Sequence, residues 1–372
     1  MTQTRPGVTT AHVRTLNRSA ILAALRKEGT ATLSHLAQVT GMTRPTALTA
    51  LEMLIGQGLA EETAARAGLQ GRPARRYRFL PGAGHVLGVA VRREHSSVVT
   101  TDLDGTVIAR DRIDLPADTP GAERLERTRQ LAAACAERTG EIWAAGVATS
   151  GIVDSAGRVT RASQLEGWTG LDLAGTVGAW FDCPAVAAND GGAAAVGERW
   201  QGSAVGADDV VLLLTGRPIG QGFLLDGRMY EGRTGAAGEL GRIQHRYNWD
   251  PSALITEWGT TFEQISTDAT AGDPVAAGRL RDVAARTAEV ASVLVSVLDP
   301  ALVVIAGDYA SGGDVFRDLV VGGLAVRASN PPPVALSTLG EDVVALGAAR
   351  LGLTIVEDAD HVRPGAAGTV DG

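Results

Sequence analysis

Apolar residues in the first 80 positions recur at the spacing of amphipathic helices. Residues 17–28 form the first such segment, and Gly29 stands where that helix should end. A short second helix is followed by a turn at Gly41, and a third helix is predicted over about residues 43–57. The apolar faces of the three helices are expected to comprise Ile21, Leu22 and Leu25, then Leu33, Leu36 and Ala37, then Leu48, Leu51, Leu54 and Ile55.

A helix, a glycine turn and a second helix in this order indicate a helix-turn-helix, whose second helix enters the major groove of DNA. Pro45 suits the first turn of that helix, because the missing N–H has no helical partner there. Arg44 is suited to a guanine edge or a phosphate. The alternative is a small three-helix module that contacts protein. The candidate DNA contacts are Thr43, Arg44, Thr46 and Thr49.

Two short strands, predicted at residues 59–62 and 76–80, flank a basic loop that contains Gly71-Arg72-Pro73. An extended Gly-Arg-Pro segment is narrow enough for a minor groove, whose negative potential attracts arginine. The loop therefore indicates the wing of a winged helix-turn-helix, although a merely solvated basic loop is the alternative. The candidate contacts here are Arg72, Arg75 and Arg76.

From residue 85 onward, short apolar runs that indicate strands alternate with amphipathic segments that indicate helices. Such alternation predicts a layered α/β architecture. We therefore divide the chain into residues 1–82, a body over 83–356, and a disordered tail over 357–372. The expected strands include 85–91, 142–148, 185–188, 210–215, 222–225 and 301–306, and the expected helices include 121–138 and 275–298.

Charge is distributed unevenly along the 372 residues, whose formal net charge is −8. Residues 1–80 hold eleven Lys/Arg and four Asp/Glu, whereas the remainder holds 23 Lys/Arg and 38 Asp/Glu. A basic head on an acidic body indicates that only the head meets a polyanion such as double-stranded DNA. No apolar run is long enough to span a membrane and no signal peptide is recognisable, so we expect a cytoplasmic protein. The two cysteines, Cys135 and Cys183, suit neither a disulfide framework nor a zinc site and are expected to be buried thiols.

Five segments of the body, taken in order, resemble the ROK family of repressors, open reading frames and sugar kinases. The resemblance implies an actin-like, ribonuclease-H-like fold of two α/β lobes, divided here near residues 190–200, with a sugar cleft between them. Members with an N-terminal winged helix are transcriptional repressors of sugar metabolism that act as dimers or tetramers. The five segments are HVLGVAV with DLDG, GVATSGIVDSAGRV with LEGW, VAANDGGAAAVGE, LLLTGRPIGQGFLLDGRMYEGRTGAAGELG, and LDPALVVIAG.

Three departures from the family pattern argue against ATP binding. Residues 90–94 read Ala-Val-Arg-Arg-Glu where kinases carry a glycine-rich Asp-x-Gly-Gly-Thr turn, so the backbone cannot approach a phosphate. In the second phosphate loop, residues 216–220, Pro218 removes a donor N–H. Asp308 places a carboxylate on the nucleotide side of the cleft, where its negative charge would disfavour an anionic nucleotide.

The zinc ligands that the family usually carries are also missing. Residues 238–245 read Gly-Glu-Leu-Gly-Arg-Ile-Gln-His, and no cysteine cluster follows. His245 alone cannot hold a structural zinc, which takes four ligands. We therefore expect no metal, no cofactor and no catalytic residue.

Groups that bind sugar hydroxyls in the family have counterparts here. The resemblance assigns this role to Asn189, Asp190, Glu239 and, across an uncertain gap, Glu257. The alternative is that they are polar residues left at helix starts. Arg242 replaces the family's histidine and suggests an anionic ligand such as a sugar phosphate, unless it forms a salt bridge with Glu239.

These observations predict a non-enzymatic, ligand-responsive DNA-binding regulator that forms a homodimer or homotetramer and senses a sugar or sugar derivative. The first rival is an active sugar kinase with a DNA-binding head. The second is an effector-independent DNA-binding oligomer, whose melting temperature no small molecule would shift.

Overall fold

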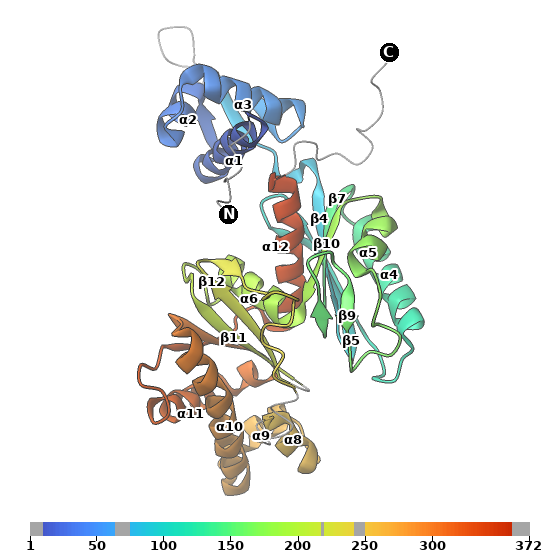
Figure 1. Ribbon diagram of the computed structural model, residues 1–372, viewed down its shortest axis with the longest axis vertical. Coiled ribbons are helices and arrows are strands. Elements are labelled where there is room, and N and C mark those ends of the chain that lie inside the picture. The colour runs from blue at the N-terminus through green and yellow to red at the C-terminus, as the bar shows by residue number, and fades with distance from the viewer. Residues whose placement is uncertain (1–9, 64–74, 217–218, 242–249, 359–372) are drawn as a thin grey trace, which may run out of the picture.

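The computed structural model describes residues 10–63, 75–216, 219–241 and 250–358. Three bodies follow one another along the long axis of the molecule (Figure 1). A small helical module lies at one end, a lobe built on one sheet lies in the middle, and a second α/β lobe lies at the other end.

The N-terminal module is a three-helix arrangement beside a small antiparallel sheet of order β1-β3-β2. Thr32 caps the second helix, and Gly41 ends it with a φ of 67°, a left-handed conformation that glycine adopts without strain. The elements are α1 (Thr10–Glu28), β1 (Thr30–Thr32), α2 (Leu33–Thr40), α3 (Arg44–Gly56), β2 (Ala60–Thr63) and β3 (Arg76–Phe79).

Three details of this module differ from the expectation. Helix α1 begins at Thr10 instead of residue 17, and strand β1 was not anticipated. Leu48 and Ile55 are exposed, because the buried face of α3 is rotated toward the small residues Ala47 and Ala50. Alanine at those positions lets α3 approach α1 closely, which apolar spacing alone did not indicate.

The first lobe is built on a five-stranded sheet of order β10-β7-β4-β5-β6. Strands β7, β4 and β10 are parallel, and β5 and β6 extend the sheet as antiparallel hairpins. Helices α4 and α5 pack on one face. The bounds are β4 (His85–Val91), β5 (His95–Asp102), β6 (Val107–Asp114), α4 (Gly121–Glu137), β7 (Ile142–Thr149), β8 (Ile152–Val153), β9 (Val159–Arg161), α5 (Leu173–Phe181) and β10 (Ala185–Asn189).

The second lobe has a five-stranded sheet of order β13-β12-β11-β14-β15. Helix α6 packs on one face, and the helices that precede and follow β14 pack on the other. The bounds are α6 (Asp190–Gln201), β11 (Val210–Thr215), β12 (Gly220–Leu225), β13 (Arg228–Met229), α8 (Pro251–Glu257), α9 (Phe262–Thr270), α10 (Pro274–Leu298), β14 (Leu302–Gly307), α11 (Gly313–Ala325) and β15 (Val334–Leu336), with 3-10 turns at η1 (Pro81–Ala83), η2 (Asp308–Gly312) and η3 (Gly340–Asp342).

Helix α12 (Val343–Asp358) returns from the second lobe to the first and lies between the first sheet and α6 (Figure 1). Glycines make this close packing possible. A Cβ on Gly88 would lie 2.1 Å from the carbonyl oxygen of Ala345, and one on Gly347 would lie 1.7 Å from that of Ala193. The expected disordered tail is therefore wrong at residues 357 and 358, which belong to α12. Residues 359–372 lie outside the described part of the chain.

Two further expectations concern the thiols and the membrane. Cys135 and Cys183 are both free, the first buried and the second half-buried. Burial raises the pKa of Cys135, and burial together with Asp182 raises the pKa of Cys183 to about 11. Among the described helices, none combines the length and apolarity that crossing a bilayer requires.

We expect Gly347→Ala to destabilise the folded chain, because the added methyl group meets the backbone of α6, which cannot yield as a flexible side chain can. A loss of about 1–3 kcal/mol is typical of overpacking in a close-packed core. Gly322→Ala is the matched control, since no atom lies within 4 Å of a Cβ at this α11 position. Thermal unfolding followed by circular dichroism should give a lower midpoint for Gly347→Ala and an equal or higher midpoint for the control. Equal midpoints for both variants would contradict the packing argument.

Candidate functional site

The N-terminal end of α3 presents its predicted residues at an accessible surface. Thr43 is the N-cap, and its hydroxyl oxygen accepts the backbone N–H of Thr46 at 3.4 Å. The hydroxyl of Thr49 donates to the carbonyl of Pro45 at 3.2 Å. Arg44, Thr43 and Thr49 are exposed and Thr46 is half-buried. The structure therefore brings all four residues to the first turns of one helix, with Arg44 extending outward.

The basic residues of the predicted wing have different surroundings. Arg75, which directly precedes β3, is exposed and forms an ion pair with Glu62 of β2 at 3.2 Å. Arg76 is half-buried and donates to the carbonyl of Thr30 at 2.8 Å, which ties β3 to β1. Arg76 therefore has a structural bond that the sequence did not indicate. Arg72 lies outside the described residues.

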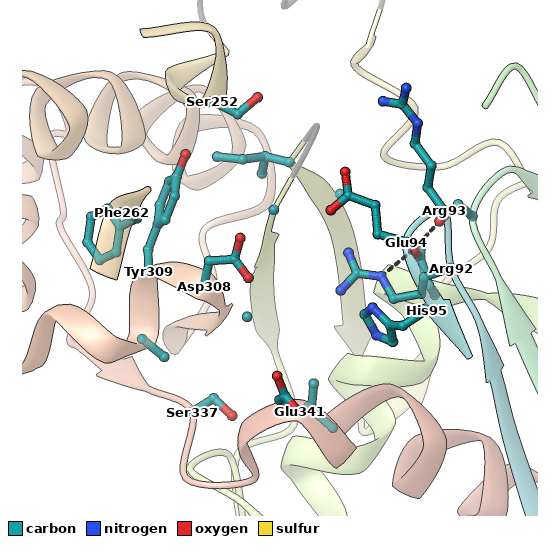
Figure 2. Close-up of a pocket in the computed structure, with 18 of the residues that line it drawn as sticks. Arg92, Arg93, Glu94, His95, Ser252, Phe262, Asp308, Tyr309, Ser337 and Glu341 are labelled. Atoms are coloured by element: carbon teal, nitrogen blue, oxygen red, sulfur yellow. Dashed lines mark hydrogen bonds and ion pairs between the residues drawn. The ribbon is translucent and has the colours of Figure 1, made fainter. Parts of the chain in front are cut away.

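A cleft of about 1030 Å³ lies between the two lobes. Figure 2 shows Arg92 and Glu94 of the β4–β5 turn, and His95 at the start of β5, across the opening from Asp308. Three of the predicted ligand-binding residues line this cleft: Asn189, Asp190 and Glu239.

Asn189 and Asp190 stand at the junction of β10 and α6, where the strand delivers them to the cleft. The side-chain oxygen of Asn189 caps α6 by accepting the N–H groups of Gly191 and Gly192, at 2.8 and 3.3 Å. The Asp190 carboxylate accepts a hydrogen bond from the Ser150 hydroxyl at 2.7 Å. Asn189 is thus mainly a structural cap, whereas Asp190 is buried at the cleft wall and can accept further hydrogen bonds.

Arg92 is a site residue that the sequence did not assign. Its Nε lies 3.6 Å from the Asp190 carboxylate, and the two side chains are only 19% and 8% exposed. The buried Arg124 donates to the Arg92 carbonyl at 2.8 Å, which fixes the backbone at the end of β4. A Cβ on Gly216 would lie 3.3 Å from Arg92 Nη2, so the guanidinium reaches the second expected phosphate loop. The sequence does show that Arg92 occupies a position where kinases of the family carry glycine. It could not show that Arg92 pairs with Asp190, because the two residues are far apart in the chain.

Glu239 and Glu257 differ in location. Glu239 lines the cleft, where partial desolvation, reinforced by Asp190 and opposed by Arg161, raises its pKa. Glu257 ends α8 with an exposed side chain and does not line the cleft. Ser252 and Ile255 of the same helix line it instead, because they face inward. Arg242 and His245 lie outside the described residues.

Asp308, the third residue that departs from the family's nucleotide site, also lines this cleft. Gly307 ends β14 with a φ of 80°, and Asp308 follows it at the cleft wall. Pro218 lies outside the described residues, although its neighbours Gly216 and Ile219 line the cleft. Within the described ranges, no three His, Cys, Asp or Glu side chains come together in a way that would hold a metal ion.

Fold and cleft together define a two-lobed α/β scaffold with a small helical module at its N-terminus. The ROK family model matches residues 86–253, a little under half of the chain.

Curated relatives include the xylose repressor of Bacillus subtilis, 20% identical, with 63% of this chain and 62% of the relative aligned. The DNA-binding transcriptional dual regulator NagC of Escherichia coli is 25% identical, with 62% of this chain and 58% of the relative covered. The chain thus aligns with about three-fifths of the length of each of these relatives.

Solved structures have the same fold. A ROK family transcriptional regulator, described as a homolog of the E. coli MLC protein, superposes with a TM-score of 0.75 at 18% identity and covers 93% of this chain and 97% of its own. A ROK family glucokinase from Streptomyces griseus has a TM-score of 0.62 at 22% identity and covers 73% of this chain and 100% of its own. The actin-like ROK fold is therefore confirmed. The fold alone does not distinguish a regulator from a kinase.

His95 should make stability depend on pH. Burial, reinforced by Arg92, Arg112 and Arg124, lowers the pKa of His95 from 6.5 to about 4. The unfolded chain therefore binds a proton at His95 between about pH 6.5 and 4 while the folded chain does not, so stability falls as the pH falls through this window.

His95→Gln should reduce this acid-dependent loss by up to about 3 kcal/mol, at about 1.4 kcal/mol for each pH unit of the window. Urea unfolding midpoints of both proteins between pH 4 and 7 measure the difference. Parallel pH profiles for the variant and the parent protein would refute the assignment.

Proposed function

We propose that this protein is a sugar-responsive transcriptional repressor, in which an N-terminal winged helix-turn-helix binds double-stranded DNA and the cleft binds a sugar or sugar derivative without phosphorylating it. The exposed N-terminus of α3, carrying Thr43, Arg44 and Thr49 on a basic module, is the observation that carries this proposal.

Support for the DNA-binding role comes from the geometry of the module. Helices α2 and α3 are separated by the turn at Gly41, and a three-stranded antiparallel sheet lies beside them, as in a winged helix-turn-helix. Arg44 is exposed at the end of α3 that would enter the major groove. Arg75 remains accessible for phosphate contact, and exchanging its Glu62 partner for phosphate would cost little at this exposure.

Support for a sugar ligand comes from the polar groups of the cleft. Asp190 and Glu239 present carboxylate oxygens, which accept hydrogen bonds from hydroxyl groups. The named relatives include repressors of xylose and N-acetylglucosamine, which suggests ligands of this class.

Arg92 argues against the kinase alternative, which the glucokinase-like fold keeps open. A kinase of this fold needs its aspartate free to take a proton from the sugar hydroxyl. Here a fixed cation lies 3.6 Å from Asp190 and extends toward Gly216, into the space between the two expected phosphate loops. A side chain in that space excludes the phosphate groups that a glycine turn would admit. The cleft therefore suits ligand binding without phosphoryl transfer.

Homodimers or homotetramers are part of the proposal, because a two-fold axis would place two recognition helices about one DNA turn apart.

Arg44→Ala should weaken DNA binding. Loss of a base contact would cost about 1–3 kcal/mol and relax sequence preference, whereas loss of a phosphate contact would lower the salt slope by about one. The measurement is fluorescence anisotropy with duplexes selected by the parent protein from a random-sequence library, over a salt series. Arg281→Ala, an exposed α10 position, removes the same charge from the second lobe and should change neither quantity. Equal affinities for the two variants would argue for the protein-contact alternative.

Asp190→Ala should abolish ligand-dependent stabilisation. A sugar at 100 times its Kd should stabilise the parent protein by about 2.7 kcal/mol, seen as a higher melting temperature. Xylose, N-acetylglucosamine, glucose and their phosphates form the screening set. No shift with any of them would favour the effector-independent oligomer, and ATP consumption that depends on both a hexose and Asp190 would establish the kinase.

A further inference from the structure

Helix α12 connects the ligand cleft with the N-terminal module. Val343, its first residue, and Glu341 of the preceding turn η3 line the cleft. Its penultimate residue, Glu357, contacts helix α1. At 1.5 Å per residue, the 16 residues of α12 span about 24 Å. One continuous helix therefore touches both of the regions to which the proposed function assigns ligands.

The cleft end of this helix is held by ion pairs to the edge strand of the first lobe. Arg112 of β6 pairs with Glu341 at 2.6 Å, and Arg110 pairs with Asp342 at 2.9 Å. Arg112 and Glu341 both line the cleft. A polar ligand in the cleft thus has direct access to charged groups that precede the first turn of α12.

The other end of α12 converges on Glu357. Its backbone carbonyl accepts hydrogen bonds from Arg18 Nη2 at 2.9 Å and from the Ser19 hydroxyl at 3.2 Å. Its carboxylate pairs with Arg26 Nη1 at 2.5 Å and with Arg350 Nη1 at 3.0 Å. Three of these partners belong to α1, and Arg18 is only 1% exposed. Cations at the C-terminal carbonyls of a helix are also favoured by its dipole.

Apolar packing makes this contact more than a surface ion pair. One buried cluster contains Ile21, Leu22 and Leu25 of α1 together with Leu353 and Val356 of α12. The guanidinium of Arg26 also donates to the carbonyl of Leu103, in the turn after β5. The N-terminal module therefore packs directly against the end of α12, in addition to its covalent connection to the first lobe.

The middle of α12 lies where the lobes meet. Its glycines contact the backbone of α6, which carries Asp190 at its start, and the backbone of the first sheet. Because such backbone-to-backbone contacts do not deform gradually, a change in lobe angle that displaces α6 also displaces α12.

We propose that Glu357 is a positioning residue that couples the cleft to the DNA-binding module, by fixing α1 on the end of α12. This inference rests on the proposed function, since it names the route by which one ligand changes the affinity for the other. Coupling between two sites is reciprocal. DNA bound at α3 must therefore also change the conformational equilibrium at the cleft end of α12.

The test is hydrogen exchange of the full-length protein with and without a duplex selected by the parent protein from a random-sequence library. In the parent, DNA should slow exchange in α3 and also change exchange in residues 340–347 by about fivefold or more. Glu357→Gln, which keeps the side-chain size, should retain the change in α3 and lose the change in residues 340–347. Asp358→Asn, the neighbouring exposed position, is the matched control and should behave as the parent.

Arg26→Gln supplies a second variant from the other side of the contact and should reproduce the Glu357→Gln result. The proposal is overturned if Glu357→Gln and Arg26→Gln both transmit the change to residues 340–347, or if the parent shows protection in α3 alone. If DNA does not slow hydrogen exchange in α3 of the parent protein, the proposed DNA-binding function is wrong. The coupling proposal, which depends on that function, is then wrong as well. If the circular dichroism spectrum shows that Glu357→Gln does not fold, the hydrogen-exchange profile of Arg26→Gln alone decides the test.

A sugar that raises the melting temperature of the parent adds a second readout. The ratio of DNA Kd with and without that sugar should differ from one by about fivefold or more in the parent and in Asp358→Asn. In Glu357→Gln the ratio should approach one, while the Kd for sugar alone stays unchanged. An unchanged ratio in Glu357→Gln would overturn the proposal.

Discussion

The close packing of α12 against α6 and the first sheet is the constraint on which the arrangement of this molecule depends. Side chains are absent at the points of contact, so backbone meets backbone at Gly88, Gly146 and Gly347. Such contacts leave no free volume for gradual adjustment, and the helices must shift together or not at all. The cleft between the lobes and the seat of the N-terminal module are both defined relative to this helix.

Within the cleft, one substitution changes the chemistry that the scaffold offers. A glycine turn at the end of β4 would leave room for phosphate groups, whereas the turn here carries Arg92, which pairs with Asp190 and approaches Gly216. Burying the two charges together is tolerable because each neutralises the other and Ser150 satisfies a further lone pair of the carboxylate. Under the proposed function, the same carboxylate accepts hydrogen bonds from a ligand and does not act as a base. Fold similarity to kinases and to regulators is thus compatible with a cleft that binds without reacting.

The basic residues of the N-terminal module fall into two groups, which only their surroundings distinguish. Arg44 is exposed at the end of α3, whereas Arg18 and Arg26 face α12 and meet Glu357. Arg76 is bound to the backbone of Thr30. The positive charge counted over residues 1–80 therefore exceeds the charge that remains accessible at the surface, because some of these residues hold the module to the body.

Sequence alone determined the α/β class, the turn at Gly41 and most of the helices and strands up to residue 306, because these follow from local periodicity and backbone preference. It did not predict strand β1 or the helices α11 and α12. It also located Asn189, Asp190 and Glu239, since they stand in motifs of the family. It could not place Glu257 outside the cleft or distinguish Arg76 from Arg44, because exposure depends on which elements pack together. The pairs Arg92–Asp190 and Arg26–Glu357 were decided only by tertiary structure, since folding joins charges that lie about 100 and about 330 positions apart in the chain.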